Sequence, residues 1–205
     1  MDQRGCGIMA TFSKSTGTLF TLASTAASDV AKSSALDVST AMGGLIYPRF
    51  GRRSATAAGA GVNIRLEASH ASSGDNSWFP FAQYVTAFAA CEGEAVSGTV
   101  SAGTNVITVA STTNLTVGDL IFIDNGTIAN SEWGRIKSIV ANTSVTIEDN
   151  LVNAQTGSTI YDAAEIYTPA EIPAGAVRIR AVADGALFTQ AFAFEARYSL
   201  ISGIA

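Results

Sequence analysis

The chain has 205 residues and a formal net charge of -5, and only 14% of its residues are charged, against roughly 25% in an average globular protein. The negative charge disfavours a nucleic-acid binder, because such proteins draw much of their affinity from Lys and Arg. No apolar run approaches the roughly 20 residues of a membrane helix, and no secretory signal pattern opens the chain. We therefore expect a protein that is made in the cytoplasm and leaves it only as part of an assembly.

The first part of the chain favours strands and loops. The segment from Met9 resembles a natural protein start, so residues 1–8 are predicted to be a flexible N-terminal arm. Residues 22–40 mix Ala, Ser and Asp without a helical face, which favours strands joined by a loop over a short helix. Arg49, Arg52 and Arg53 form the main basic cluster, around a Pro and a Gly. We interpret it as a solvated turn or a subunit-contact patch rather than a phosphate site.

Alternation of apolar and polar residues predicts long strands on both sides of the middle region. Residues 62–69 alternate with a period of two, and residues 177–182 and 187–200 do the same. One buried face and one wet face are typical of an antiparallel β-sandwich. The fold class is therefore predicted to be all-β, with a jelly-roll-like sandwich.

The middle of the chain has shorter and more closely spaced strands. They are expected at 106–109, 120–123, 136–140 and 145–147, with a hairpin-like turn at 141–144. Such a series over roughly 70 residues predicts a small barrel. About 37 C-terminal residues could not form a core alone, so they are expected to return to the first sandwich. The predicted domains are a discontinuous sandwich (9–93 and 167–205) and an inserted small β-barrel (94–166).

Aromatic residues suggest two possible contact sites. Trp78, Phe79 and Phe81 stand close together, and Trp133 stands apart in the predicted barrel. Core packing is the simplest interpretation of the first group. Exposed aromatics could alternatively stack on sugars or anchor a protein interface, and Trp133 leaves these alternatives open.

The sequence gives little support for catalysis or metal binding. His70 is the only histidine and is interpreted as a polar loop residue rather than a general base. The candidate carboxylates show no acid–base pairing and no EF-hand spacing; they are Asp119, Asp124, Glu132, Glu148, Asp149 and Asp162. Cys6 and Cys91 form neither a disulfide framework nor a zinc site. We therefore predict a non-enzymatic protein with no cofactor, no metal and no catalytic residue.

Several stretches resemble virion structural proteins of tailed double-stranded DNA bacteriophages. They are the start at Met9–Ser15, the turn at Gly74–Pro80, and Val106–Val109 followed by Leu115–Asp119, within an Ala-, Thr-, Ser- and Gly-rich chain. The likeness is greatest to capsid decoration (cement) proteins. It implies a homo-oligomer, often a trimer, that binds the major coat protein on the outside of the capsid and stabilises the lattice, without nucleic acid or membrane as a partner.

Two other roles and a contact surface complete the sequence-based predictions. The alternatives are a tail, baseplate or head–tail connector component, and a carbohydrate-binding receptor module. The residues expected to contact a partner are those most often found as interface anchors at turns, together with their neighbours. They are Arg49, Arg52, Arg53, Asp75, Trp78, Trp133 and Arg135.

Overall fold

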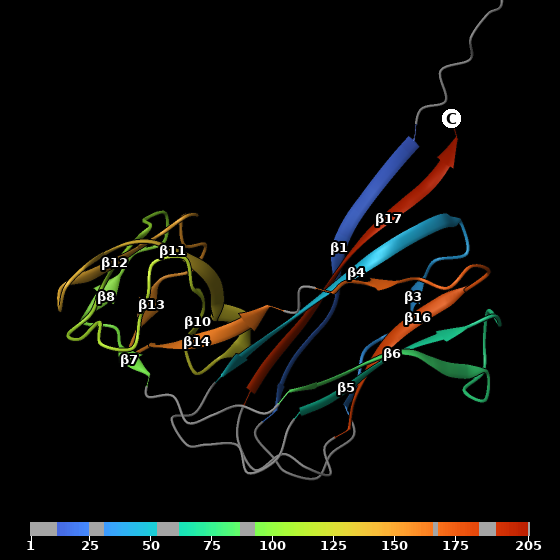
Figure 1. Cartoon of the computed structure of the whole chain (residues 1–205), viewed down its shortest axis with the longest axis horizontal. Helices are drawn as coiled ribbons and strands as arrows, with labels where there is room; N and C mark the ends of the chain where they lie inside the picture. The colour runs from blue at the N-terminus through green and yellow to red at the C-terminus, as the bar shows by residue number, and fades with distance from the viewer. Residues whose placement is uncertain are drawn as a thin grey trace, which may run out of the picture.

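The computed structural model describes residues 12–24, 31–52, 62–86, 93–165, 168–184 and 192–204, and they form an all-β protein. The strands of the first half are β1 (Phe12–Ser24), β2 (Ala31–Lys32), β3 (Leu36–Asp37), β4 (Ala41–Arg52), β5 (Val62–Ser69) and β6 (Trp78–Thr86). The strands of the last part are β15 (Ala170–Glu171), β16 (Arg178–Asp184) and β17 (Phe192–Ile204). These strands build a sandwich of two antiparallel sheets, which confirms the predicted fold class (Figure 1).

Each sheet of the sandwich has a C-terminal strand at its centre. In one sheet β17 lies between β1 and β4, and β15 pairs with β4. In the other, β16 lies between β5 and the short strands β2 and β3, and β6 extends the sheet beyond β5. The chain therefore returns from the middle region to complete both sheets, as its alternating C-terminal pattern predicts.

The core of the sandwich is filled by the apolar face of each alternating strand. Ile64, Leu66 and Ala68 of β5 pack in the same buried cluster as Phe194 and Ala196 of β17. The rings of Phe50 and Phe194 lie 4.8 Å apart and are tilted by 51°. Burial of these side chains supplies the main stabilisation of the two-sheet body.

The middle region forms a small barrel with its own core. Its strands are β7 (Glu94–Ala95), β8 (Thr99–Val100), β9 (Val106–Thr108), β10 (Leu120–Asp124), β11 (Glu132–Val140), β12 (Ser144–Ile147), β13 (Gln155–Thr156) and β14 (Thr159–Glu165), with a 3₁₀ turn at Ile128–Asn130. The buried side chains come from residues 96–160 alone. Asn142, with φ of 51°, makes the tight turn between β11 and β12 at the predicted position.

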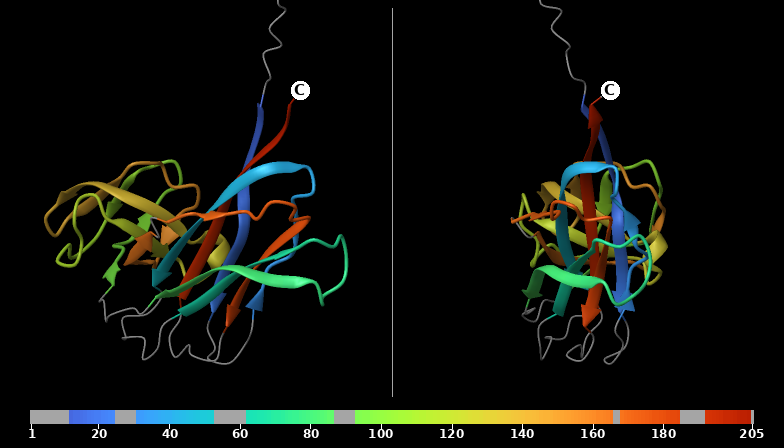
Figure 2. Two further views of the ribbon diagram at one scale, coloured as in Figure 1. Left: turned by 45° about the vertical axis from the view of Figure 1, so that its right-hand side comes forward. Right: turned by 90° about the vertical axis from the view of Figure 1, so that its right-hand side faces the viewer.

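One strand joins the barrel to the sandwich. Thr159–Asp162 of β14 pair with β10, and Ala163–Glu165 pair with β4. A single hydrogen-bonded path therefore runs from β1 through β14 to β9 at the far side of the barrel (Figure 2). Because β14 serves both sheets, the boundary between the predicted domains at 166/167 stays a prediction, as does that at 93/94. The predicted arm at 1–8 lies outside the described residues.

Candidate functional site

Two of the predicted contact residues meet where the barrel touches the sandwich. The guanidinium of Arg49, on β4, lies 4.4 Å from the ring centre of Trp133, on β11. The same guanidinium donates to Glu195 Oε2 of β17 at 2.8 Å. Cation–π attraction and a charge-assisted hydrogen bond thus hold Arg49 between the two lobes. We call Arg49, Gly51, Phe122, Trp133 and Glu195 the lobe contact.

The lobe contact is closely packed. The rings of Phe122 and Trp133 lie 4.9 Å apart. A Cβ on Gly51 would come within 2.7 Å of Phe122 and 3.0 Å of Trp133, so the backbone of β4 lies directly against both rings. Trp133 is therefore half-buried between the lobes. Its ring faces a guanidinium of the same chain, and this geometry does not favour the interpretation of Trp133 as a sugar-stacking residue.

The turn expected at the basic cluster is a strand. β4 continues through Arg49 to Arg52, which pairs with Phe192 of β17. Among the described residues, Pro48 has no strand partner on the side of β14 and β15, since Arg49 pairs with Glu165 and Ile46 pairs with Ala170. The side chain of Arg52 is not described, and Arg53 lies outside the described residues. The structure therefore does not describe a surface shared by all three arginines.

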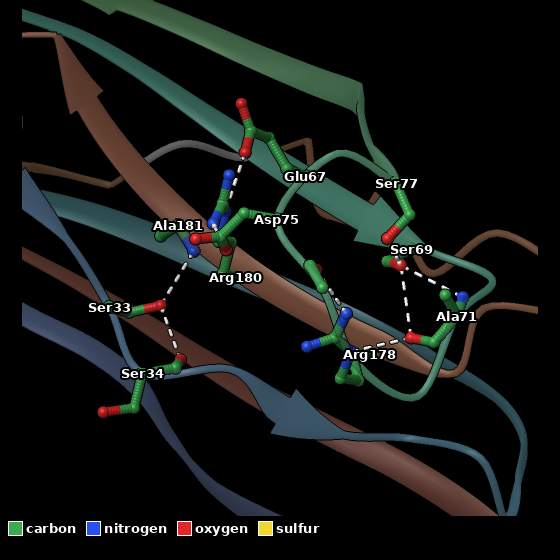
Figure 3. A network of polar contacts seen from close by, with 11 residues as sticks. Ser33, Ser34, Glu67, Ser69, Ala71, Asp75, Ser77, Arg178, Arg180 and Ala181 are labelled. Carbon is green, nitrogen blue, oxygen red and sulfur yellow. Dashed lines mark hydrogen bonds and ion pairs between the residues drawn. The ribbon is translucent and has the colours of Figure 1, made fainter.

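A second group surrounds Trp78 on the outward face of the other sheet. The guanidiniums of Arg178 and Arg180, on β16, lie 4.8 and 4.1 Å from the Trp78 ring centre. Arg180 also donates to Glu67 Oε2 at 2.8 Å and lies 3.5 Å from Asp75 Oδ1 (Figure 3). Glu67 is only 8% exposed, although it lies on the outward face of β5. The arginines, the indole and the acid together cover the centre of this face.

The same group holds the loop that contains Asp75. Arg178 donates from Nε to the Ala71 carbonyl at 2.7 Å and from Nη2 to the Gly74 carbonyl at 2.9 Å (Figure 3). The hydroxyls of Ser69 and Ser77 lie 2.6 Å apart across the base of the loop. These contacts explain why Trp78 and two arginines gather here: they fix the loop between β5 and β6. Asp75 itself is exposed, although its carboxylate lies near Arg180.

His70 is an anchor of the same loop. Its Nδ1 lies 2.8 Å from the Gly175 carbonyl, and its ring stacks on Phe79 at 5.0 Å. The first contact joins the loop after β5 to the loop before β16, and the second holds the ring against strand β6. The hydrogen bond and the stacking give this exposed histidine a structural role.

Arg135 and the barrel carboxylates also make local contacts. Arg135 donates to the Gly118 carbonyl at 2.7 Å. Asp119 accepts from the Thr116 N–H at 3.0 Å, Asp124 from the Gly126 N–H at 3.0 Å, and Glu132 from the Asn153 N–H. Asp119 and Asp124 each close a turn, as the turn-rich sequence suggests, whereas Glu132 holds the loop at Val152 and Asn153 from strand β11. Within the described ranges, no three Cys, His, Asp or Glu side chains gather as a metal site.

Two titratable groups among the described residues have shifted pKa values with local causes. Hydrogen bonds from the Ser39 hydroxyl and backbone N–H lower the pKa of Asp37 in the turn before β4. Burial raises the pKa of Tyr84, whose hydroxyl donates to the Thr168 carbonyl at 3.4 Å. Both groups lie outside the lobe contact and the Trp78 group.

The sequence interpretation missed a hollow on the outward face of β1, β17 and β4. It has a volume of about 570 Å³, and its lining includes Lys14, Tyr47, Arg197, Tyr198 and Ser199. Register explains the grouping: Arg197 lies directly opposite Tyr47, and Thr16 lies opposite Ser199. The outward alternation of Glu195, Arg197 and Ser199 was visible in the sequence, but β1 and β4, which supply the other wall, were not predicted as strands.

Comparison with known proteins identifies no family to which the chain is similar. No model of a known protein family matches the chain, and a search of curated proteins gives no significant match. In the part of the chain that the structure describes, no helix has the length and apolar character to span a membrane.

Proposed function

We propose that the chain is a non-enzymatic structural protein of a bacteriophage particle, which binds the outside of the assembled capsid and stabilises the coat lattice. The observation that carries the proposal is the joined two-lobed β body. β14 belongs to the sheets of both lobes, and Arg49 links Trp133 of the barrel to Glu195 of the sandwich. Such a body can touch two neighbouring subunits at a fixed spacing.

Surface chemistry and local contacts also support the proposal. Only 14% of residues are charged, and an uncharged polar surface costs less to desolvate against another protein than a charged one. The contacts of His70, Arg178 and Arg180 give structural reasons for residue types that could otherwise suggest catalysis. The stabilising mechanism is mass action: a protein that binds only the assembled shell lowers the free energy of that state by an amount that depends on affinity and occupancy.

The test is quantitative mass spectrometry of purified phage particles that encode the chain, with copies counted relative to the major coat protein. Decoration predicts a copy number comparable to that of the coat, and particles stripped of the chain should lose heat resistance and regain it on re-addition. A few copies per particle would favour the tail or head–tail connector instead. Absence from the particle would contradict a virion role.

A further inference from the structure

The charges of the chain are divided unevenly between its two lobes. Residues 94–165 contain eight acidic side chains and only two basic ones, Arg135 and Lys137, which gives this segment a net charge of -6. The remainder of the chain has ten basic and nine acidic residues. The barrel is therefore the acidic part of the protein, and the rest of the chain is close to neutral, with a net charge of +1.

The outward face of β1, β17 and β4 carries Lys14, Arg49 and Arg197 among exposed apolar side chains, with the acids Glu171 and Glu195 beside them. Lys14 lies opposite Ile201 and Arg197 opposite Tyr47, so the four side chains share one face. Tyr47 and Ile201 are exposed by 45% and 44%, and Arg197 and Lys14 are also exposed. Large apolar side chains with Arg nearby are the composition of a protein interface. We call these four residues the sandwich face.

The sandwich face is hollowed. The 570 Å³ hollow lined by Lys14, Tyr47 and Arg197 adjoins a second of about 310 Å³ lined by Ile201, since Ser199 lines both. The chain's own barrel touches this side of the sheet at Arg49, and Tyr47 and Ile201 lie progressively further along the strands from it. Figure 2 shows β1 and β17 extending past the barrel. This face is therefore concave where the chain's own barrel does not cover it.

The barrel presents a turn of complementary chemistry. Glu148 and Asp149 are exposed directly after β12, and Val152, in the same turn, is 79% exposed. Hydrogen bonds to strand β11 hold the turn: the Glu148 N–H donates to the Arg135 carbonyl, and the Val152 N–H donates to Glu132. Residues 148–152, which we call the barrel turn, thus offer two carboxylates and an apolar side chain in a fixed loop.

We propose that the sandwich face binds the barrel turn of a second copy of this chain. Glu148 and Asp149 of one copy pair with Lys14 and Arg197 of the next, while Val152 packs near Tyr47 and Ile201. Desolvated Arg–carboxylate pairs give such a contact its orientation, and apolar burial adds affinity. Because the two surfaces differ, the contact is head-to-tail. Repeated contacts produce a closed ring when the rotation from each copy to the next brings the last copy back to the first. The inference rests on charge and exposure, and it does not require the proposed capsid role.

The test is the mass of the purified full chain at about 100 µM by light scattering coupled to size-exclusion chromatography, which detects an interface with a Kd in the micromolar range. The wild type should have a measured mass of at least two times 21.1 kDa, in whole multiples of that value. Lys14→Glu/Arg197→Glu and Glu148→Lys/Asp149→Lys should each give monomer. The chain with all four changes should associate again, since every contact then has its charges exchanged.

Controls separate a lost contact from a lost fold. Lys32→Glu reverses an exposed lysine on β2, in the other sheet, and should leave the assembly intact. Ile201→Glu disrupts the sandwich face without changing the Arg197–Glu195 contact of 3.6 Å, and should also give monomer with an unchanged circular dichroism spectrum. A monomeric wild type, or an oligomer that survives both charge reversals, would overturn the proposal.

Discussion

Burial decides the energetic weight of the two acids that Arg180 contacts. Glu67 Oε2 lies 2.8 Å from Arg180 and its side chain is 11% exposed, whereas Asp75 Oδ1 lies at 3.5 Å and its side chain is 89% exposed. Water screens the second interaction almost fully, but it screens the first only in part. The same guanidinium therefore makes one strong and one weak ion pair.

Replacing the two acids separately should show this difference. We expect Glu67→Ala to lower the free energy of unfolding by about 2 kcal/mol, because it leaves the Arg180 side chain, which is only 12% exposed, without its close carboxylate. Asp75→Ala should change it by less than about 0.5 kcal/mol. Urea denaturation of both variants measures the difference. Equal effects of the two substitutions would show that Glu67 contributes no more than a surface acid.

At this scale the sequence could identify residue types but not their partners. Arg49, Trp78 and Trp133 were predicted to contact something, and all three make arginine–aromatic contacts within the chain. The partners of Arg49 and Arg180 lie 146 and 113 positions away along the sequence. Short-range patterns carry no information on such pairs, so interface composition and internal packing look alike in the sequence. Whether any predicted contact residue also binds a partner stays a prediction.

Strand β4 packs tightly against the barrel at one of its glycines and has open space at another. At Gly51 the backbone lies against Phe122 and Trp133, and at Gly43 an added Cβ would meet nothing within 4 Å. Gly44 is crowded as well, since an added Cβ there would come within 2.7 Å of the Ser199 carbonyl oxygen, but the need for glycine at Gly51 has a different origin. This need follows from the approach of the barrel, since both close neighbours of Gly51 lie in barrel strands β10 and β11.

Alanine at these two positions gives a matched test of the lobe contact. We expect Gly51→Ala to destabilise the protein by about 1–3 kcal/mol, because two rings must move from a closely packed site. Gly43→Ala should be neutral or stabilising by up to about 1 kcal/mol, since it restricts the unfolded chain without a clash. Thermal unfolding followed by tryptophan fluorescence measures both. Equal stability of the two variants would contradict a tight contact between the lobes.

Strands with a clear apolar pattern could be predicted, whether alternating or continuous, but β4 could not. β5 occupies residues 62–69 as expected, since Ile64 and Leu66 alternate with Arg65 and Glu67. β4 was missed because Gly and Pro are disfavoured in strands and four of its twelve residues are of these types. Neighbouring strands stabilise β4 where its own sequence does not. Long-range pairing with β17 and β14 decides its conformation.

On the scale of the whole molecule, the order of the chain and the order of the strands differ. The last 39 residues supply the central strands of both sandwich sheets, and more than half of the buried side chains in that core. The barrel draws its buried cluster from residues 96–160 only. The sequence suggested this arrangement because the short C-terminal part could not form a core alone. It could not show that β14 would join the two sheets.

Removal of residues 167–205 should therefore unfold one lobe and leave the other. Without β16 and β17, neither sandwich sheet retains the strand that joins its remaining members, so the apolar faces of β4 and β5 lose their packing. The barrel retains its whole core, and domains of about 60–70 residues can fold alone. Amide NMR spectra of the truncated chain should show dispersed signals for the barrel alone, superimposable on those of a fragment of residues 94–166. Dispersed signals from residues 9–93 would contradict a sandwich that depends on its C-terminal strands, and loss of the barrel signals would show that β4 is needed to hold β14.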